Sequence, residues 1–187
     1  MSERFERIET AIDGLYVLQR KPIRDARGYL ERMFCTEELE WLLGERQIRQ
    51  INRTRTGAQG TVRGLHFQLT PHAETKLVSC LGGRVFDVAV DVRAGSPTFL
   101  QWHGEELSEE NGRTLVIPEG FAHGFQTLTA DCRMLYVHTA AYTPEAERGL
   151  HACDPSLSID WPLPITEQSG RDQRLPLLTS DFRGITL

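Results

Sequence analysis

A short stretch of the chain, residues 60–76, holds three side chains suited to acid–base chemistry. They are an arginine (Arg63), an imidazole (His66) and an ammonium group (Lys76), set among glycines and strand-forming residues. A histidine can take a proton from carbon at neutral pH, and cations can hold the negative charge that then develops on a neighbouring carbonyl oxygen. The stretch therefore suggests proton abstraction beside a carbonyl group, although a single histidine in a strand is more commonly a structural residue.

Composition limits the class of protein that surrounds these residues. The chain has 187 residues, a formal net charge of −5 and 40% hydrophobic residues, which fits a single domain over residues 1–187. It has no apolar run long enough to cross a bilayer and no signal-peptide pattern at its start. We expect a cytoplasmic protein that binds neither nucleic acid nor membranes, although a local basic pocket could hold a phosphorylated ligand.

The four cysteines are widely spaced and form no Cys-x-x-Cys pair. They are Cys35, Cys80, Cys132 and Cys153. This spacing predicts reduced thiols and not a zinc site or a disulfide framework.

Most of the chain alternates short runs of β-forming residues with turn signals, which is typical of a β-sandwich or barrel. Residues 25–28 are predicted to form a turn, and one helix is predicted at residues 37–43, capped by Thr36 and ended by Gly44. The predicted strands are residues 14–18, 29–34, 50–56, 61–67, 76–81, 85–92, 114–117, 124–128 and 133–139.

Gly82 and Gly83 separate two apolar runs and predict a two-residue hairpin turn. The register of that hairpin would place Leu81 opposite Arg84, Val78 opposite Asp87 and Lys76 opposite Ala89. One face would then be apolar, with Leu77, Phe86, Val88 and Val90. The other face would carry Lys76, Val78, Asp87, Ala89 and Asp91, and would be either a solvated surface or a polar pocket inside a barrel.

Two segments resemble the paired motifs of the cupin barrel, residues 60–68 and 113–123, each of which ends in or contains a histidine after a glycine. A metal-binding cupin needs a second histidine two residues after the first, because a divalent ion requires three or four converging ligands. Phe67 and Gln68 follow His66 instead. The sequence therefore predicts a site without a metal ion, in which His66 and His123 are available for other roles. We expect no cofactor.

A series of further motifs runs through nearly the whole chain in order. They are Asp25-x-Arg-Gly28, Gln50-x-Asn-x-Thr54, Val62-Arg-Gly-Leu-His66, Lys76, residues 85–93, Gly95-Ser-Pro-Thr-Phe99, residues 117–125, Leu135-Tyr136, Tyr142-x-Pro144, residues 159–162 and Arg171-Asp172. Together they resemble the dTDP-4-dehydrorhamnose 3,5-epimerase family, metal-free cupins that act on nucleotide-linked 4-keto-6-deoxy sugars. The resemblance implies a jelly-roll barrel, a double-stranded β-helix with short helices and terminal arms.

The resemblance also implies a role for each matching residue. It gives His66 as the catalytic base, Asp172 as the carboxylate that orients it, Lys76 as the cation that stabilises the enolate and Tyr136 as the acid on the opposite face. The positions implied to contact the sugar or the diphosphate are Gln50, Asn52, Arg63, His123, Tyr142 and Arg171. Arg27 matches a residue that reaches into the site of the partner subunit, which implies a homodimer with exchanged N-terminal arms.

The residues alone leave two geometric questions open. Strict alternation along a strand would put Arg63 and His66 on opposite faces, so both can enter one pocket only if Gly64 marks a bulge or bend. The hairpin register also offers Asp87 as a competing partner for His66, and Asp172 is preferred to it only through the resemblance.

The expected activity is inversion at C3 and C5 of a nucleotide-linked, dTDP-type 4-keto-6-deoxyhexose in deoxysugar biosynthesis. Two positions depart from the family pattern: Leu30 stands where an aromatic residue is common, and Arg32 where a glutamate is usual. Inversion at a single carbon, or keto-isomerisation of a related sugar nucleotide, is the alternative activity. A sugar-binding cupin without catalysis is the alternative from another class, but it would be expected to lack a base, an acid or an oxyanion cation.

Overall fold

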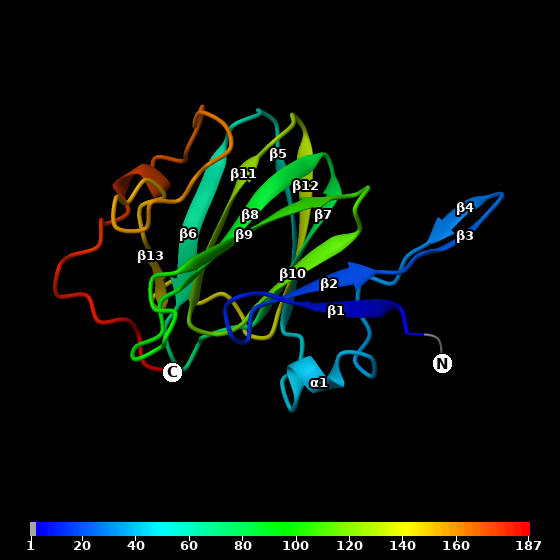
Figure 1. Cartoon of the computed structure of the whole chain (residues 1–187), viewed down its shortest axis with the longest axis horizontal. Helices are drawn as coiled ribbons and strands as arrows, with labels where there is room; N and C mark the ends of the chain where they lie inside the picture. The colour runs from blue at the N-terminus through cyan, green and yellow to red at the C-terminus, as the bar shows by residue number, and fades with distance from the viewer. Residues whose placement is uncertain (1–2) are drawn as a thin grey trace.

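Two antiparallel β-sheets face each other and contain almost all of the regular structure (Figure 1). The computed structural model describes residues 3–187. In spatial order the first sheet consists of β1 (Phe5–Glu9), β2 (Tyr16–Arg20), β10 (Arg113–Ile117), β7 (Lys76–Gly82), β12 (Cys132–His138) and β5 (Gln50–Thr56). The second sheet consists of β13 (Glu147–Gly149), β6 (Val62–Gln68), β11 (Phe121–Thr127), β8 (Arg84–Asp91) and β9 (Trp102–Ser108). The predicted all-β architecture is confirmed.

The hydrophobic core has an inner layer and two outer layers, because successive residues of a strand point to opposite faces. Between the sheets lie side chains such as Val78, Ala89 and Phe125. The outer face of the first sheet, including Leu77, packs against the segment around helix α1 (Glu40–Leu43). Val88, Val90 and their neighbours on the outer face of the second sheet are covered by the C-terminal segment, including Leu178, Phe182 and Ile185.

Two arms extend from this barrel, as predicted. Strands β3 (Ile23–Asp25) and β4 (Gly28–Leu30) form a small hairpin that projects away from the barrel (Figure 1). At the other end of the chain, the segment after β13 runs past the second sheet and contains a short 3₁₀ turn, η1 (Asp172–Arg174). That turn contacts β6, so the C-terminal arm reaches the strand that carries His66.

The predicted hairpin at Gly82 and Gly83 is wrong. Strand β7 pairs with β10 and β12 in the first sheet, whereas β8 pairs with β9 and β11 in the second. The two glycines therefore carry the chain from one sheet to the other. Gly83 has a φ of +75°, and a Cβ there would lie 2.7 Å from Thr129 Oγ1, so the crossing is sterically reserved for glycine.

The faces predicted with that hairpin are nevertheless largely right, because both strands border the same interior. Val78 and Ala89 point into the inner core, while Leu77 and Val88 point to the two outer layers. The polar face could have been a solvated surface or a polar pocket. The structure shows a pocket inside the barrel, because Lys76 lines a cavity there.

The predicted helix at residues 37–43 begins too early. Only Glu40–Leu43 is helical, Leu39 is its N-terminal flanking residue, and no side chain caps it. Glu38, expected in the first turn, accepts a hydrogen bond from the backbone N–H of Arg4 at 2.7 Å and is ion-paired with Arg32. These tertiary contacts of Glu38 thus take the place of the predicted first turn. Gly44, with a φ of +54°, ends the helix as predicted.

Candidate active site

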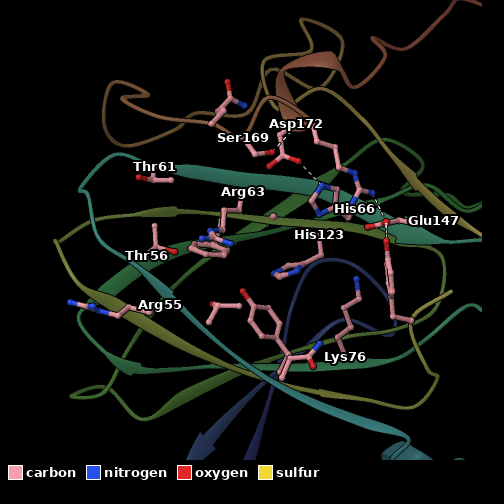
Figure 2. Close-up of a pocket in the computed structure, with 18 of the residues that line it drawn as sticks. Arg55, Thr56, Thr61, Arg63, His66, Lys76, His123, Glu147, Ser169 and Asp172 are labelled. Atoms are coloured by element: carbon pink, nitrogen blue, oxygen red, sulfur yellow. Dashed lines mark hydrogen bonds and ion pairs between the residues drawn. The ribbon is translucent and has the colours of Figure 1, made fainter. Parts of the chain in front are cut away.

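A cavity of about 930 Å³ lies between the two sheets (Figure 2). Its walls come from strands of both sheets and from the C-terminal arm. The cavity collects all the predicted site residues except Arg27: Gln50, Asn52, Arg63, His66, Lys76, His123, Tyr136, Tyr142, Arg171 and Asp172.

A bulge in β6 allows Arg63 and His66 to enter the same cavity. His66 pairs with His123 of β11 and Arg63 pairs with Phe125, so two residues of β6 oppose the single residue Gly124. Gly64 lies within this bulge with a φ of +118°, and a Cβ there would lie 2.6 Å from the Cα of Gly124. The bulge expected at Gly64 is therefore confirmed, and only glycine fits it.

His66 is paired with a carboxylate of the C-terminal arm. Its Nε2 lies 2.8 Å from Asp172 Oδ1, as Figure 2 shows, and the Asp172 side chain is 5% exposed. Burial acts to raise the pKa of Asp172, but the hydrogen bond and charge of His66, together with the backbone N–H of Gly64, hold the pKa below its ordinary value. The ionised Asp172 fixes the imidazole through Nε2 and leaves Nδ1 as the nitrogen that can accept a proton.

Asp87 has a different partner. Its Oδ1 lies 2.9 Å from His123 Nε2, and the residue is fully buried. Burial raises the pKa of Asp87, against the opposing effects of His123 and Lys76. The structure thus contains two neighbouring histidine–carboxylate pairs, and the open choice between Asp87 and Asp172 as the partner of His66 is resolved in favour of Asp172.

Tyr136 lines the cavity from β12, a strand of the sheet opposite to the one that carries His66. Its ring centroid lies 6.1 Å from that of His123. Burial, and secondarily the charge of Asp87, raise the pKa of the Tyr136 hydroxyl well above its usual range. The phenol is therefore protonated at neutral pH and can donate a proton from the wall opposite to His66.

Lys76 belongs to a buried network, two of whose members were not predicted from the sequence. Glu74 Oε1 lies 3.2 Å from Lys76 Nζ, and Glu74 Oε2 lies 2.8 Å from His138 Nδ1. His138 has one available sequence signal: it follows Tyr136 by two residues on a strand and therefore shares its face. No such signal marks Glu74, which precedes β7.

A second unpredicted acid, Glu147, lies at the edge of the cavity. It is ion-paired with Arg171 and accepts a hydrogen bond of 2.6 Å from the Tyr142 hydroxyl. Glu147 stands on the short strand β13, which was not predicted, so its position could not be inferred from strand alternation.

Arg27 lies apart from this group of residues. It stands in the turn between β3 and β4 with a side chain that is 90% exposed, and its guanidinium pairs with Asp25 at 2.6 Å. Within one chain the projecting hairpin carries Arg27 away from the barrel (Figure 1).

Comparison with known proteins identifies the family to which this cavity belongs. A family model described as dTDP-4-dehydrorhamnose 3,5-epimerase matches residues 9–180. The chain belongs to this family. It is 47% identical over 152 residues to a dTDP-4-dehydrorhamnose 3,5-epimerase from Sinorhizobium fredii, covering 81% of this chain and 78% of the relative.

A solved structure agrees with that assignment. A dTDP-6-deoxy-D-glucose-3,5-epimerase from Legionella pneumophila, in complex with dTDP-4-keto-L-rhamnose, is 45% identical with a TM-score of 0.88, covering 92% of each chain. The family resemblance, the cupin-type fold and the class of sugar-nucleotide 3,5-epimerase, all expected from the sequence motifs, are confirmed.

A more distant neighbour has a narrower described activity. A double mutant of a 3'-monoepimerase from Streptomyces bikiniensis, in complex with dTDP, is 28% identical, with a TM-score of 0.84 over 90% of this chain and 85% of that one. One fold thus supports epimerisation at one carbon as well as at two.

Two features are absent from the described residues, 3–187. These residues contain no group of three or more histidine, cysteine, aspartate or glutamate residues placed to hold a metal ion. They also contain no helix that is long and apolar enough to cross a membrane.

Proposed function

We propose that this 3,5-epimerase inverts C3 and C5 of a dTDP-linked 4-keto-6-deoxyhexose through enolate intermediates, with His66 as base and Tyr136 as acid. The observation that carries the proposal is that His66, fixed by Asp172, and a protonated Tyr136 line one cavity from opposite sheets. Inversion requires a proton to leave one face of a carbon and another to arrive on the opposite face, which this arrangement provides.

In the first half of each inversion, Nδ1 of His66 bonds to the proton as the C–H bond next to the ketone breaks. The electron pair of that bond forms a carbon–carbon double bond, and the ketone oxygen becomes an enolate. Lys76, Arg63 and His123 supply positive charge or hydrogen bonds on the cavity wall to hold this oxygen. Among residues 3–187, no acidic partner of Arg63 is found within ion-pair distance, so its charge is available to the substrate.

In the second half, the Tyr136 O–H bond breaks and its proton bonds to carbon from the opposite face, which regenerates the ketone. The imidazolium of His66 and the phenolate of Tyr136 then return to their starting states by proton exchange with solvent. Repeating the cycle at the second carbon next to the ketone gives the doubly inverted sugar. Because each step moves only protons, the mechanism needs no cofactor or metal.

The diphosphate and nucleotide would occupy the part of the cavity lined by Gln50, Asn52, Tyr142 and Arg171. We place Arg27 of the partner subunit at this end in a homodimer, because the Arg27 side chain is 90% exposed on a hairpin that projects from its own barrel. The chain would act as a single domain in the cytoplasm, in the biosynthesis of dTDP-rhamnose or a similar deoxysugar of cell-surface polysaccharides.

Inversion at one carbon is the second candidate, favoured by the 3'-monoepimerase neighbour. The departures at Leu30 and Arg32 lie in and beside the projecting hairpin, where Leu30 is 64% exposed and Arg32 is ion-paired with Glu38. The two candidates are separated by incubating the enzyme in D₂O with a panel of nucleotide-linked 4-keto-6-deoxy sugars. NMR should show deuterium at both C3 and C5 of the dTDP-linked sugar, whereas incorporation at one carbon only would favour the second candidate.

A further inference from the structure

Glu74 lies where it contacts two groups of the cavity at once. Its side chain is 8% exposed, and it precedes β7 by two residues. One carboxylate oxygen is 3.2 Å from Lys76 Nζ, and the other is 2.8 Å from Nδ1 of His138. A carboxylate buried to this extent requires charged or hydrogen-bonding partners, and both of its oxygens have one.

The ammonium group of Lys76 depends on this contact. Its side chain is 10% exposed, and a buried charged group is costly unless an opposite charge is close to it. The other carboxylates that line or adjoin the cavity have partners of their own: Asp172 binds His66, Asp87 binds His123, Glu147 binds Arg171, and Glu167 accepts a hydrogen bond from Thr61. Glu74 is therefore the carboxylate that directly compensates the charge of Lys76.

His138 links the same carboxylate to the acid of the reaction. The rings of Tyr136 and His138 are stacked, with centroids 6.0 Å apart and an interplanar angle of 19°. On its other edge, His138 Nε2 lies 3.5 Å from the Asn52 side-chain amide. Glu74 thus contacts both Lys76, the cation assigned to the enolate, and His138, whose ring stacks on Tyr136.

We propose that Glu74 is a positioning residue of the epimerase, which holds the Lys76 ammonium in the cavity by an ion pair and holds the His138 ring against Tyr136. This inference rests on the proposed function, because it assigns Lys76 to the enolate and Tyr136 to proton donation. Glu74 acts through these neighbours. The titratable groups around Lys76 and His138 are Glu74 before β7, Tyr136 on β12, Asp87 on β8 and His123 on β11.

The ionisation of Glu74 fits this role. Burial acts to raise its pKa, but the hydrogen bond from His138 and the charge of Lys76 outweigh burial, and the pKa lies below its ordinary value. Glu74 is therefore a carboxylate throughout the neutral range.

The test is Glu74→Gln, which keeps the shape of the side chain and removes its charge. Without the carboxylate that holds Lys76 and His138, kcat should fall by up to about 10² to 10³, the usual loss for a missing oxyanion donor. KM should change much less, because Glu74 does not contact the substrate in the proposed site. Glu145→Gln, which removes an exposed carboxylate, is the matched control and should leave kcat unchanged.

A second measurement does not use catalysis. The rate at which acetic anhydride acetylates Lys76 at one fixed pH, followed by mass spectrometry, reports how strongly the ammonium is held in its ion pair with Glu74. In Glu74→Gln this rate should rise about 10-fold or more over wild type, because the ion pair is lost. An enzyme inactive on every sugar tested would contradict the proposed function, yet the acetylation rates would still test the pairing of Glu74 with Lys76.

Glu74→Asp makes the test independent of whether the Gln variant folds. Asp keeps the charge on a side chain one methylene shorter, so Lys76 should be acetylated at a rate close to wild type. The proposal is overturned if Glu74→Gln leaves the rate at the wild-type value, or if Glu74→Asp raises it by about 10-fold or more.

Discussion

His66 and Asp172 are 106 residues apart in the chain, and their side chains meet at 2.8 Å. His66 lies on β6 of the barrel, whereas Asp172 begins a 3₁₀ turn in the C-terminal arm. The catalytic pair of the proposed mechanism therefore forms only when the arm docks on the barrel. Docking of the arm thus completes the catalytic pair.

This pair predicts a pH dependence of stability. The pKa of Asp172 is lower in the folded protein than its ordinary value of 3.8, so the unfolded chain binds more protons between the two values. The stabilisation by the carboxylate is complete above the unfolded pKa and is lost as the pH falls through the folded pKa. Asp172→Asn should therefore lower the free energy of unfolding at pH 7 and have a smaller effect near pH 3.

Urea unfolding at the two pH values measures this difference. Asp160→Asn, at an exposed carboxylate, is the control. It should lower the free energy of unfolding only slightly, and equally at both pH values. An Asp172→Asn penalty that is the same at pH 3 and pH 7 would show that the carboxylate charge does not contribute to docking the arm.

Lys76 is predicted to act on the rate of the chemical step. Lys76→Ala should lower kcat by about 10² to 10³, the usual loss for a missing oxyanion donor, with a much smaller change in KM. Steady-state kinetics on the dTDP-linked sugar provides the measurement, with the exposed Lys21→Ala as control. An unchanged kcat with a raised KM would make Lys76 a phosphate contact instead.

The histidines of the cavity predict that catalysis does not depend on a metal ion. His66 and His123 each bind a carboxylate through Nε2, and Phe67 and Gln68 occupy the positions where a metal-binding cupin would continue its ligand motif. Exhaustive treatment with EDTA, followed by assay in metal-free buffer, should leave kcat unchanged. Loss of turnover that a divalent ion restores would contradict this expectation.

Arg27 gives a prediction about assembly. If its exposed hairpin completes the partner's site, a dimer of one Arg27→Ala chain and one His66→Ala chain has one site with both changes and one with neither. Random subunit exchange makes about half of the dimers mixed, so about a quarter of all sites should be intact. Mixing the two inactive homodimers should therefore restore activity to about that fraction of wild type.

Native mass spectrometry must first show that the subunits exchange. If they do, and the mixture remains as inactive as the separate variants, Arg27 does not serve the neighbouring site.

Local sequence patterns predicted the strands around the cavity well, but they predicted the connections between those strands less well. The bulge at Gly64 could be anticipated because alternation alone cannot place Arg63 and His66 in one pocket. The turn at Gly82 and Gly83 was misread because glycines permit a sharp change of direction without specifying whether the next strand returns to the same sheet. That choice depends on β11 and β12, which follow much later in the chain.

Strands β1 and β13 were not predicted because they are stabilised by pairing with neighbouring strands and not by an apolar pattern of their own. Strand β1 has mostly exposed side chains and is held by its pairing with β2, so it has no apolar pattern of its own. Strand β13 has three residues and forms on the edge of β6. Glu74 and Glu147 are comparable, since each has a cavity partner that is distant in sequence: His138 for Glu74, and Arg171 of the C-terminal arm for Glu147.

The roles of His66 and Tyr136 are tested most directly by comparing deuterium exchange with inversion in two variants, His66→Ala and Tyr136→Phe. With the dTDP-linked 4-keto-6-deoxy sugar in D₂O, His66→Ala should lose both exchange and inversion, by about 10² to 10⁴ in rate, because no base removes the proton. Tyr136→Phe should still exchange hydrogen for deuterium on the face of His66 while failing to invert the carbon. Equal loss of exchange and inversion in Tyr136→Phe would contradict the assignment of Tyr136 as the acid on the opposite face.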